Sequence, residues 1–402
     1  MSNKVEMLKE LYPEDLYGFT QKLSEGEVEV LYELRKALEK HLDPIIAESW
    51  NKADFPFDEF YKVVEDVHIM NDPRLFEGRD EKYKASEFYI MGLYLELARF
   101  DASIATFFTV HGGLGFNTVL LGGNERQIEE FAPKIMSFEW QTCFALTEPD
   151  HGSDIAGGLA TTAERDGDEW ILNGEKRWIG GSDTADIIPV FARDTEDNQV
   201  KCFMVRKDAE GYEASPIPDK VSLRPIRNGH ISIKNVRVAE EDRLQNINSF
   251  KDVARILTFT RADVAHIAMG VTAGAFVGAL DYTKKREQFN KPVAGYQLVQ
   301  EKLARMQSNV VTTLAYSSRI AEMQEEGNAQ MLNSSLAKMS NSLHMRETVS
   351  LAREVCGGNG ITLGSKVARF FADAEAIYTY EGSHEINALI VGRAITGLGA
   401  FV

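Results

Sequence analysis

The stretch Ile377-Tyr378-Thr379-Tyr380-Glu381-Gly382-Ser383-His384-Glu385-Ile386, near the end of the chain, decides how the rest is interpreted. It sets a carboxylate between an aromatic residue and a glycine, just before an apolar helical pattern. Gly382 can adopt backbone angles closed to other residues, Ser383 is a good helix N-cap, and Glu385 falls in a first helical turn, where negative charge is favoured. The pattern predicts a tight turn that aims Glu381 at a pocket. Taken alone, the stretch fits a solvated glutamate before a capped helix equally well.

Length, composition and charge are those of a soluble protein with several domains. The chain has 402 residues, 44% of them hydrophobic and 26% charged, which leaves room for about two or three domains. Its net charge of −17 argues against nucleic acid or an anionic membrane as a partner, although it does not exclude an anionic cofactor. The first ten residues lack an apolar segment, so no signal peptide is expected. We also expect no membrane span, because a span needs a run of about 18 apolar residues.

The cysteines and the last residues bear on the compartment. Cys143, Cys202 and Cys356 show no CxxC spacing, which indicates a reducing compartment and no zinc site. Residues 399–402 are not a peroxisomal address. The expected location is therefore the cytoplasm.

The hydrophobic period changes twice along the chain. It predicts an N-terminal α-helical domain over residues 1–138, a middle β domain over 139–246 and a C-terminal α-helical domain over 247–402. The predicted helices are 27–40, 88–100, 104–121, 128–136, 262–285, 303–326 and 331–355, with Gly357 as a C-cap and a charged loop over 71–83. The glycines at 270, 274 and 278 indicate close packing between helices.

Alternating apolar residues mark the strands of the middle domain. Residues 169–172 and 176–179 flank Asn173-Gly174, which predicts a β-hairpin with its turn there. Further strands are predicted at 187–191, 201–205 and 230–234, the first two separated by a polar turn over 194–199.

A kinked turn opens the middle domain at residues 144–154. Thr147 and Ser153 place hydroxyls there beside backbone N–H groups, an arrangement suited to a polar heterocycle or a phosphate, and equally to a surface loop. His151 has no second histidine or cysteine at metal-ligand spacing, so a metal site is rejected.

Two later stretches are candidates for binding a cofactor. The basic and aromatic stretch over residues 286–292 could hold a pyrophosphate, although a charged turn between helices is the better interpretation of it alone. Residues 354–360 contain a glycine cluster that follows a helix, not a strand, and lacks the GxGxxG register. Rossmann-type NAD binding is therefore not expected, and these glycines are interpreted as a place where a ligand approaches the backbone.

In this combination and order, the stretches make the chain resemble the acyl-CoA dehydrogenase family over about residues 25–402. The matches are Leu146-Thr147-Glu148-Pro149 with Gly152-Ser153-Asp154, Trp178-Ile179, Arg286 with Gln288-Phe289, Gly357-Gly358-Asn359-Gly360 and Tyr380-Glu381-Gly382. The tail over residues 378–401 is most similar to glutaryl-CoA dehydrogenases and to plant short-chain acyl-CoA oxidases.

The resemblance implies an α+β multidomain fold: an N-terminal α-helical domain, a middle β-barrel-like domain and a C-terminal four-helix bundle, assembled as a homotetramer. It implies FAD between the β domain and the bundle, held partly by a neighbouring subunit. The residues implied on the flavin side are Phe144, Leu146, Thr147, Gly152, Ser153 and Trp178. Those implied on the pyrophosphate and adenosine side are Arg286, Gln288, Phe289, Glu354, Gly358, Ser383 and Glu385. Those implied to meet the acyl-CoA are Ser153, Arg261, Tyr380 and Gly382.

The resemblance also implies a mechanism. Glu381 would take the α-proton of a saturated acyl-CoA while the β-hydride moves to flavin N5, giving trans-2-enoyl-CoA. The N–H of the base and a flavin ribityl hydroxyl would stabilise the developing enolate, and burial beside Tyr380 should make the carboxylate more basic. Some family members carry the base immediately before the position of Arg261, where this chain has Thr260, so Glu381 stands alone. Electron-transferring flavoprotein would be the oxidant.

Departures from the family pattern bear on the subclass. Glutaryl enzymes place an arginine for the distal carboxylate where this chain has Ala105, beside Ile104, so a neutral acyl chain is expected. Gly180 replaces the usual threonine after Trp-Ile, as in some oxidases, and could open space for oxygen. Residues 70–84 lack a usual Gly-rich stretch, and Asn290 replaces a usual glycine. The alternatives are an acyl-CoA oxidase, a glutaryl-CoA dehydrogenase and a non-catalytic acyl-CoA- or flavin-binding protein.

Overall fold

The computed structural model describes residues 3–399, which form two compact units. The sheet unit holds Phe107–Lys220 and Ile226–Thr260. The helical unit holds residues 3–106, Val221–Pro225 and residues 261–399. Residues 1–2 and 400–402, including most of the tail predicted not to be a peroxisomal address, lie outside the described residues. The domain boundaries at 138 and 246 stay predictions.

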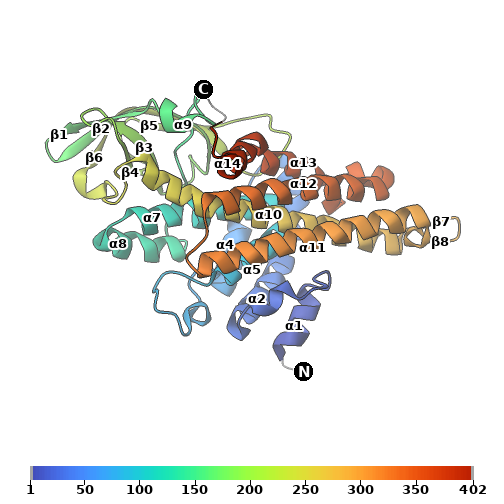
Figure 1. Ribbon diagram of the computed structural model, residues 1–402. Helices are drawn as coiled ribbons and strands as arrows, with labels where there is room; N and C mark the ends of the chain where they lie inside the picture. Colours follow the sequence, from blue (N-terminus) through green and yellow to red (C-terminus); the bar gives the residue numbers. More distant parts are fainter. Residues whose placement is uncertain (1–2, 400–402) are drawn as a thin grey trace. The chain divides into compact units, whose positions relative to one another are not determined.

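The helical unit consists of long helices joined by short turns (Figure 1). Its elements are α1 (Asn3–Leu11), η1 (Phe19–Lys22), α2 (Glu25–His41), α3 (Ile46–Lys52), α4 (Phe57–Val67), η2 (Pro73–Phe76), α5 (Glu87–Phe100), the larger part of α10 (Phe250–Lys285), β7 (Glu287–Gln288), β8 (Lys291–Pro292), η5 (Val293–Gly295), α11 (Gln297–Glu325), α12 (Met331–Val355), η6 (Gly357–Ile361), α13 (Lys366–Thr379) and α14 (His384–Thr396). Helix α12 packs against α11, α13 and α14. The helices predicted in these segments are confirmed, most with shifted ends, and Gly357 follows α12 with φ +56°.

Close backbone packing explains two of the three spaced glycines in α10. A Cβ atom at Gly270 would lie 2.6 Å from the Cβ of Ala98, and one at Gly274 would lie 2.5 Å from the carbonyl oxygen of Arg99. Helix α10 therefore touches α5 with its backbone. At Gly278 the nearest atom would be a methyl group of Val367 at 3.4 Å, an ordinary contact.

The sheet unit is built on six strands in the order β4-β3-β1-β2-β6-β5 (Figure 1). Its strands are β1 (Thr162–Asp166), β2 (Glu169–Gly180), β3 (Ile187–Asp194), β4 (Val200–Arg206), β5 (Tyr212–Pro216) and β6 (Asn228–Ala239). Its helices are the end of α6 (Ala102–Phe108), the π-helical η3 (Thr109–Gly115), α7 (Phe116–Gly122), α8 (Glu125–Met136), α9 (Ile155–Gly158), η4 (Glu240–Asp242) and the start of α10. Strands β1 and β3 run parallel and the other pairs are antiparallel. Its core includes Trp170, Phe203 and Val236.

The hairpin predicted at Asn173-Gly174 is wrong. Strand β2 continues through this dipeptide and pairs with β6 on both sides, with a register shift between Leu172 and Gly174. The turn lies earlier, at Gly167-Asp168, where Asp166 pairs with Glu169. Asn173 faces two residues of β6, Lys234 and Asn235, so the bulge lies on β6. A Cβ at Gly174 would lie 2.5 Å from the hydroxyl oxygen of Thr161, which favours glycine there.

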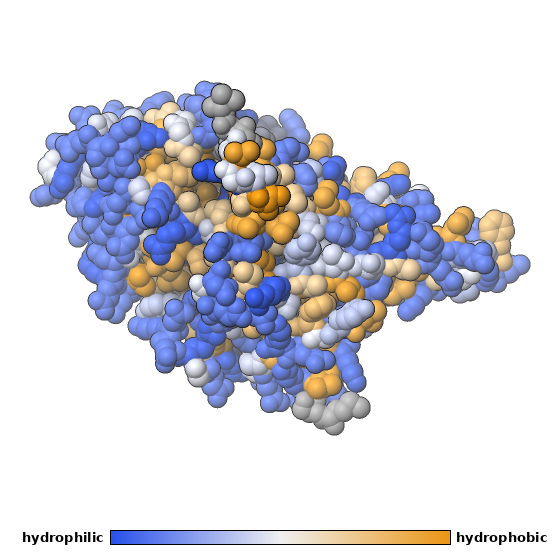
Figure 2. All heavy atoms as spheres, viewed as in Figure 1, coloured by the Kyte–Doolittle hydropathy of each residue, from blue (hydrophilic) through white to orange (hydrophobic). Residues whose placement is uncertain are grey.

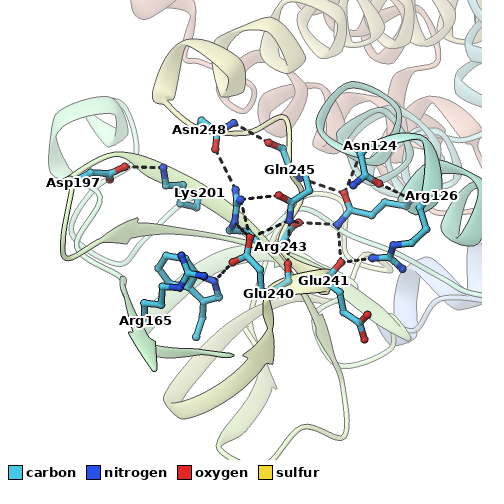
Figure 3. A network of polar contacts seen from close by, with 12 residues as sticks. Asn124, Arg126, Arg165, Asp197, Lys201, Glu240, Glu241, Arg243, Gln245 and Asn248 are labelled. Carbon is cyan, nitrogen blue, oxygen red and sulfur yellow. Dashed lines mark hydrogen bonds and ion pairs between the residues drawn. The ribbon is translucent and has the colours of Figure 1, made fainter. Parts of the chain in front are cut away.

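A polar network ties the end of β6 to α8 within the sheet unit (Figure 3). The Gln127 side chain donates to the carbonyls of Glu241 and Arg243, at 2.8 and 2.7 Å. The Arg243 guanidinium donates to Glu240 at 2.9 Å, and Glu240 accepts from the indole N–H of Trp170 at 2.6 Å. The loop that enters α10 is thus anchored to the core of the sheet.

Contrary to the expectation from sequence, two described stretches are long and apolar enough to cross a membrane by length and composition alone. They are Ala102–Gly122 and Phe250–Lys285, and 67% and 83% of their most apolar windows are buried inside the protein. Core helices pass the same test, and both stretches are mostly buried.

Candidate active site

The turn between α13 and α14 carries Glu381 in a strained backbone. Glu381 and Gly382 both have left-handed conformations, with φ +56° and +79°. Ser383 caps α14, because its hydroxyl accepts a hydrogen bond from the N–H of Ile386 at 3.3 Å. Glu385 lies in the first turn, where hydrogen bonds from its own backbone N–H and from Ser383 lower the pKa of its carboxyl group. The predicted turn and N-cap are confirmed. A glutamate in the left-handed conformation costs about 1–3 kcal/mol, which contacts with its surroundings must offset.

Two buried side chains hold this turn. The ammonium group of Lys338, on α12, donates to the carbonyls of Tyr378 and Gly382 at 2.8 and 2.9 Å. The amide nitrogen of Asn387, on α14, donates to the carbonyls of Gly382 and Ser383 at 2.8 and 3.0 Å. Both side chains are fully buried.

Tyr380 directly precedes the base in the chain, and the buried Arg261 lies close to it. The hydroxyl groups of Tyr380 and Thr106 are 3.3 Å apart, and burial raises the pKa of Tyr380 above its usual range. Arg261 is 8% exposed and lies against Gly382. Burial lowers the pKa of Arg261, and the Glu381 carboxylate opposes that shift. A buried cation therefore faces the predicted base.

Asp263 adds a buried acid to this environment, and the buried Glu87 acts on Asp263 in turn. Burial raises the pKa of Asp263 well above its usual range, and Glu87 and Glu381 raise it further, while a hydrogen bond with Tyr94 opposes them. Burial also raises the pKa of Glu87 to about 7, with Lys84 opposing the shift. Burial therefore favours the protonated form of the Asp263 carboxyl group.

In the sheet unit, the turn over residues 144–154 rests on a buried ion pair. The Glu148 carboxylate accepts from the ammonium group of Lys176 at 2.9 Å and from the N–H groups of Ala160 and Thr161 at 2.6 and 2.9 Å. Lys176 also donates to the carbonyl of Leu146 at 3.1 Å. The pair fixes the backbone on both sides of Thr147.

The same turn presents the predicted hydroxyl groups. Thr147 is half-buried and Ser153 is exposed, while a Cβ at Gly152 would meet only a methyl group of Thr147, at 3.8 Å. Of the other predicted residues, Leu146 is buried and Phe144 is half-buried. The turn therefore leaves the hydroxyl group of Ser153 and the backbone at Gly152 accessible to a ligand.

His151 is a turn residue in the sheet unit. Its ring nitrogen Nδ1 lies 2.8 Å from a carboxylate oxygen of Asp154. Within residues 3–399, no group of three or more histidine, cysteine, aspartate or glutamate side chains could hold a metal ion.

Trp178 occupies a β-bulge in β2. Arg177 pairs with His230 and Ile179 pairs with Gly229, so Trp178 is the extra residue, with φ +65°. Its side chain is 53% exposed, unusual for an indole. The bulge presents an aromatic face to a ligand.

The basic and aromatic stretch forms the small hairpin β7–β8 at the end of α10. Phe289 and Asn290, both at positive φ, make its two-residue turn, which explains why asparagine is accepted where the family usually has glycine. Arg286 and Gln288 are exposed, and Phe289 is 88% exposed. Tyr296 supports the hairpin by donating its hydroxyl to the carbonyl of Gln288 at 2.8 Å.

The turn after α12 joins the hairpin end of α10. The side-chain amide of Asn359 donates to the hydroxyl of Tyr282 at 2.8 Å, near the end of α10. Glu354 is exposed and pairs with Lys302 at 3.2 Å. A Cβ at Gly358 would meet no atom within 4 Å, so the backbone is open to a ligand.

The helical unit separates its predicted site residues into two groups. Arg261 lies in the group around Glu381, and Arg286 lies just beyond the other end of α10, about 36 Å away along the helix. Figure 1 shows the same separation between α14 and β7–β8. One cofactor molecule cannot touch both groups of a single chain.

Sequence reasoning missed four residues that the structure places at these sites: Lys338, Asn387, Asp263 and Lys176. Each looks like an ordinary polar residue in a helix or strand pattern. Lys338 and Gly382, for example, are 44 residues apart. Only the fold makes their role visible.

Three family models match consecutive parts of the chain: the acyl-CoA dehydrogenase N-terminal domain over residues 24–139, the middle domain over 143–236 and the C-terminal domain over 250–396. A 3-(aryl)acrylate reductase of Clostridium sporogenes is 30% identical over 364 residues, covering 89% of this chain and 95% of that protein. A glutaryl-CoA dehydrogenase structure from Mycobacterium smegmatis has a TM-score of 0.89 at 31% identity, covering 97% of this chain and 99% of that one. Another glutaryl-CoA dehydrogenase structure from M. smegmatis, in complex with FADH2, has a TM-score of 0.89 at 28% identity, with the same coverage.

Proposed function

Because the chain belongs to the acyl-CoA dehydrogenase family, we propose that it oxidises a neutral, saturated acyl-CoA to trans-2-enoyl-CoA, with Glu381 as the base. The matching family models and solved structures confirm the predicted family and the order of helical, β and helical parts. They also confirm the oxidoreductase class and FAD as the cofactor. The observation that carries the proposed role of Glu381 is its strained, doubly anchored turn beside the buried Arg261.

The residues present fit FAD. In the sheet unit, the exposed indole of Trp178 offers a stacking face for a planar ring, and the open groups of Thr147, Gly152 and Ser153 offer hydrogen bonds. Arg286 and Phe289 in the helical unit suit a pyrophosphate and an aromatic base. When bound, FAD supplies the hydride acceptor.

The proposed work of the chain's own residues follows from the turn. A carboxylate oxygen of Glu381 takes the α-proton, and the backbone N–H of the same residue donates to the thioester oxygen. Holding Glu381 in one backbone conformation fixes both groups together. Arg261 adds a buried positive charge where negative charge develops.

A neutral acyl chain is favoured over glutaryl-CoA. Ala105, at the position of the glutaryl enzymes' arginine, and Ile104 are fully buried. The adjacent Thr106 contacts Tyr380. Glutaryl-CoA, the substrate in the names of the similar structures, is therefore not the substrate that we propose for this chain.

We also propose a homotetramer that passes electrons to electron-transferring flavoprotein. The separation of the β7–β8 hairpin from Glu381 supports a site completed by a second copy. Exposed apolar side chains of the helical unit support the same proposal, and Figure 2 shows apolar atoms over α14, where Ile395 is 74% exposed. Light scattering measures the oligomeric state, and reduction of purified electron-transferring flavoprotein tests the acceptor.

The decisive experiment is an anaerobic screen of flavin bleaching with acyl-CoA substrates of increasing chain length, including glutaryl-CoA. Neutral saturated substrates should bleach the flavin of the wild-type protein, while Glu381→Gln should keep its FAD and stay oxidised. Bleaching of Glu381→Gln at the wild-type rate would remove Glu381 as the base. Release of carbon dioxide from glutaryl-CoA would overturn the substrate assignment.

An acyl-CoA oxidase is the second candidate, because of Gly180. A Cβ at this position would lie 3.0 Å from a methyl group of Val110 in η3, so Val110 already fills part of the space that a threonine would take. This limits the room for oxygen and favours the dehydrogenase. Hydrogen peroxide formed at the turnover rate without an added acceptor would favour the oxidase instead.

A further inference from the structure

Lys338 joins the two ends of the segment that carries the base. It lies in the middle of α12 and is fully buried. One of its acceptors is the carbonyl of Tyr378, in the last turn of α13, and the other is that of Gly382, directly after Glu381. A single ammonium group therefore spans the backbone on both sides of Glu381.

The backbone that Lys338 spans is strained. A glutamate at φ +56° relaxes toward negative φ unless its neighbours prevent it. Relaxation would move the carboxylate and the N–H of Glu381 together. A displacement of about 1 Å at a reacting group can reduce a rate on the order of 100-fold.

We propose that Lys338 is a positioning residue for Glu381, whose charged ammonium group holds the turn in the conformation that proton abstraction requires. This inference rests on the proposed role of Glu381 as the base. Asn387 donates to the same carbonyl of Gly382 and to that of Ser383, but a neutral amide makes weaker hydrogen bonds than an ammonium group.

The charges around Lys338 come from three elements. Glu381 in the turn and Glu385 on α14 favour its charged form, and Arg261 on α10 opposes it. Burial is the largest effect and lowers the pKa of Lys338 to about 8. Lys338 is therefore charged at neutral pH and becomes a neutral amine as the pH rises through about 8. The rate of proton abstraction should fall over the same range.

The test measures anaerobic flavin reduction by a good acyl-CoA substrate from pH 6 to 10. The wild-type rate should fall above about pH 8. Lys338→Met should be slower at neutral pH on the order of 100-fold, with unchanged FAD content and substrate affinity, and should lose the alkaline decrease. Lys338→Arg, which stays charged, should recover part of the rate and also lack the decrease. Lys36→Met, at an exposed lysine of α2, is the matched control and should behave like the wild type.

A second readout does not depend on activity. Carbon-13 NMR of lysines labelled at Cε, with the Lys338 signal identified by its loss in Lys338→Met, should titrate at the pH where the wild-type rate falls. If Lys338→Met does not fold, the Lys338→Arg profile and this titration, with the signal identified by its loss in Lys338→Arg, still test the inference. A wild-type rate and alkaline decrease in Lys338→Met, or a Lys338 signal that does not titrate between pH 7 and 9, would overturn the inference. The proposed function fails separately, when Glu381→Gln is bleached like the wild type.

Discussion

Two buried lysines do similar work on two turns. Lys338 donates to the carbonyls that flank Glu381, and Lys176 donates to the carbonyl just before Thr147 and to Glu148. Both side chains are fully buried, and burial lowers the pKa of each to about 8. A lysine that reaches backbone carbonyls from a neighbouring element can fix a turn whose own sequence must keep its polar groups for a ligand.

Removing Lys176 should destabilise the sheet unit strongly. Lys176→Met leaves Glu148 as a buried charge without its cation, so we expect a loss of about 3–5 kcal/mol in the free energy of unfolding, together with weaker FAD retention. Chemical denaturation and flavin content after gel filtration measure the two effects. Lys207→Met is the matched control, because Lys207 and its partner Asp186 are both partly exposed, and it should cost less than about 1 kcal/mol. Equal losses in both variants would contradict the role given to the buried pair.

At the scale of the element, α10 is shaped by what its backbone touches. Gly270 and Gly274 let it approach α5, while its residues near Arg261 face the turn of Glu381. Its length then separates that turn from the β7–β8 hairpin. The length of this helix thus supports the proposal that a second copy completes the cofactor site.

The packing of α10 predicts opposite results at two of its glycines. Gly274→Ala should destabilise the protein by about 1–3 kcal/mol, because its Cβ would lie 2.5 Å from a backbone oxygen that cannot move aside. Gly278→Ala has only an ordinary contact at 3.4 Å and should be neutral or stabilising by up to about 1 kcal/mol, because alanine favours helix. Thermal and chemical unfolding of the pair measure the difference. A stabilised Gly274→Ala would show that α10 and α5 do not approach so closely.

At the scale of the whole molecule, the protein buries acids although its net charge is already −17. Burial raises the pKa values of Glu87 and Asp373 to about 7 each. Asp373 accepts from the N–H of Leu223 at 2.6 Å and from the indole of Trp50 at 3.1 Å, so it holds Val221–Pro225 on the helical unit. Between about pH 4.5 and 7 the folded protein keeps a proton on Glu87 that the unfolded chain has lost, so stability falls as the pH rises through this window.

Replacing Glu87 tests this dependence on pH. Glu87→Gln cannot ionise, so the decrease in the free energy of unfolding from pH 5 to 7.5 should shrink by about 3 kcal/mol. Denaturation at the two pH values gives the slope, and Glu39→Gln, at an exposed position of α2, serves as the control. An unchanged slope in Glu87→Gln would place the titration elsewhere.

The sequence by itself determined the features that depend on neighbouring residues. The helix and strand periods predicted the order of helical, β and helical parts, and Gly382 with Ser383 predicted the capped turn. The motifs and their order identified the family, because binding a flavin and deprotonating a thioester require particular residues within short stretches of sequence. Local patterns failed at Asn173-Gly174, because β2 continues through this dipeptide and pairs with β6 on both sides, although the dipeptide's own chemistry favours a turn.

The tertiary structure alone decided what surrounds Glu381. Lys338, Asn387 and Arg261 come from three different helices, and their burial exists only once those helices pack. The raised pKa of Asp263 likewise follows from burial beside other acids. Hydrogen bonds across 44 residues and the removal of charges from water leave no mark in a local pattern, because their free energy depends on contacts that only the folded chain makes.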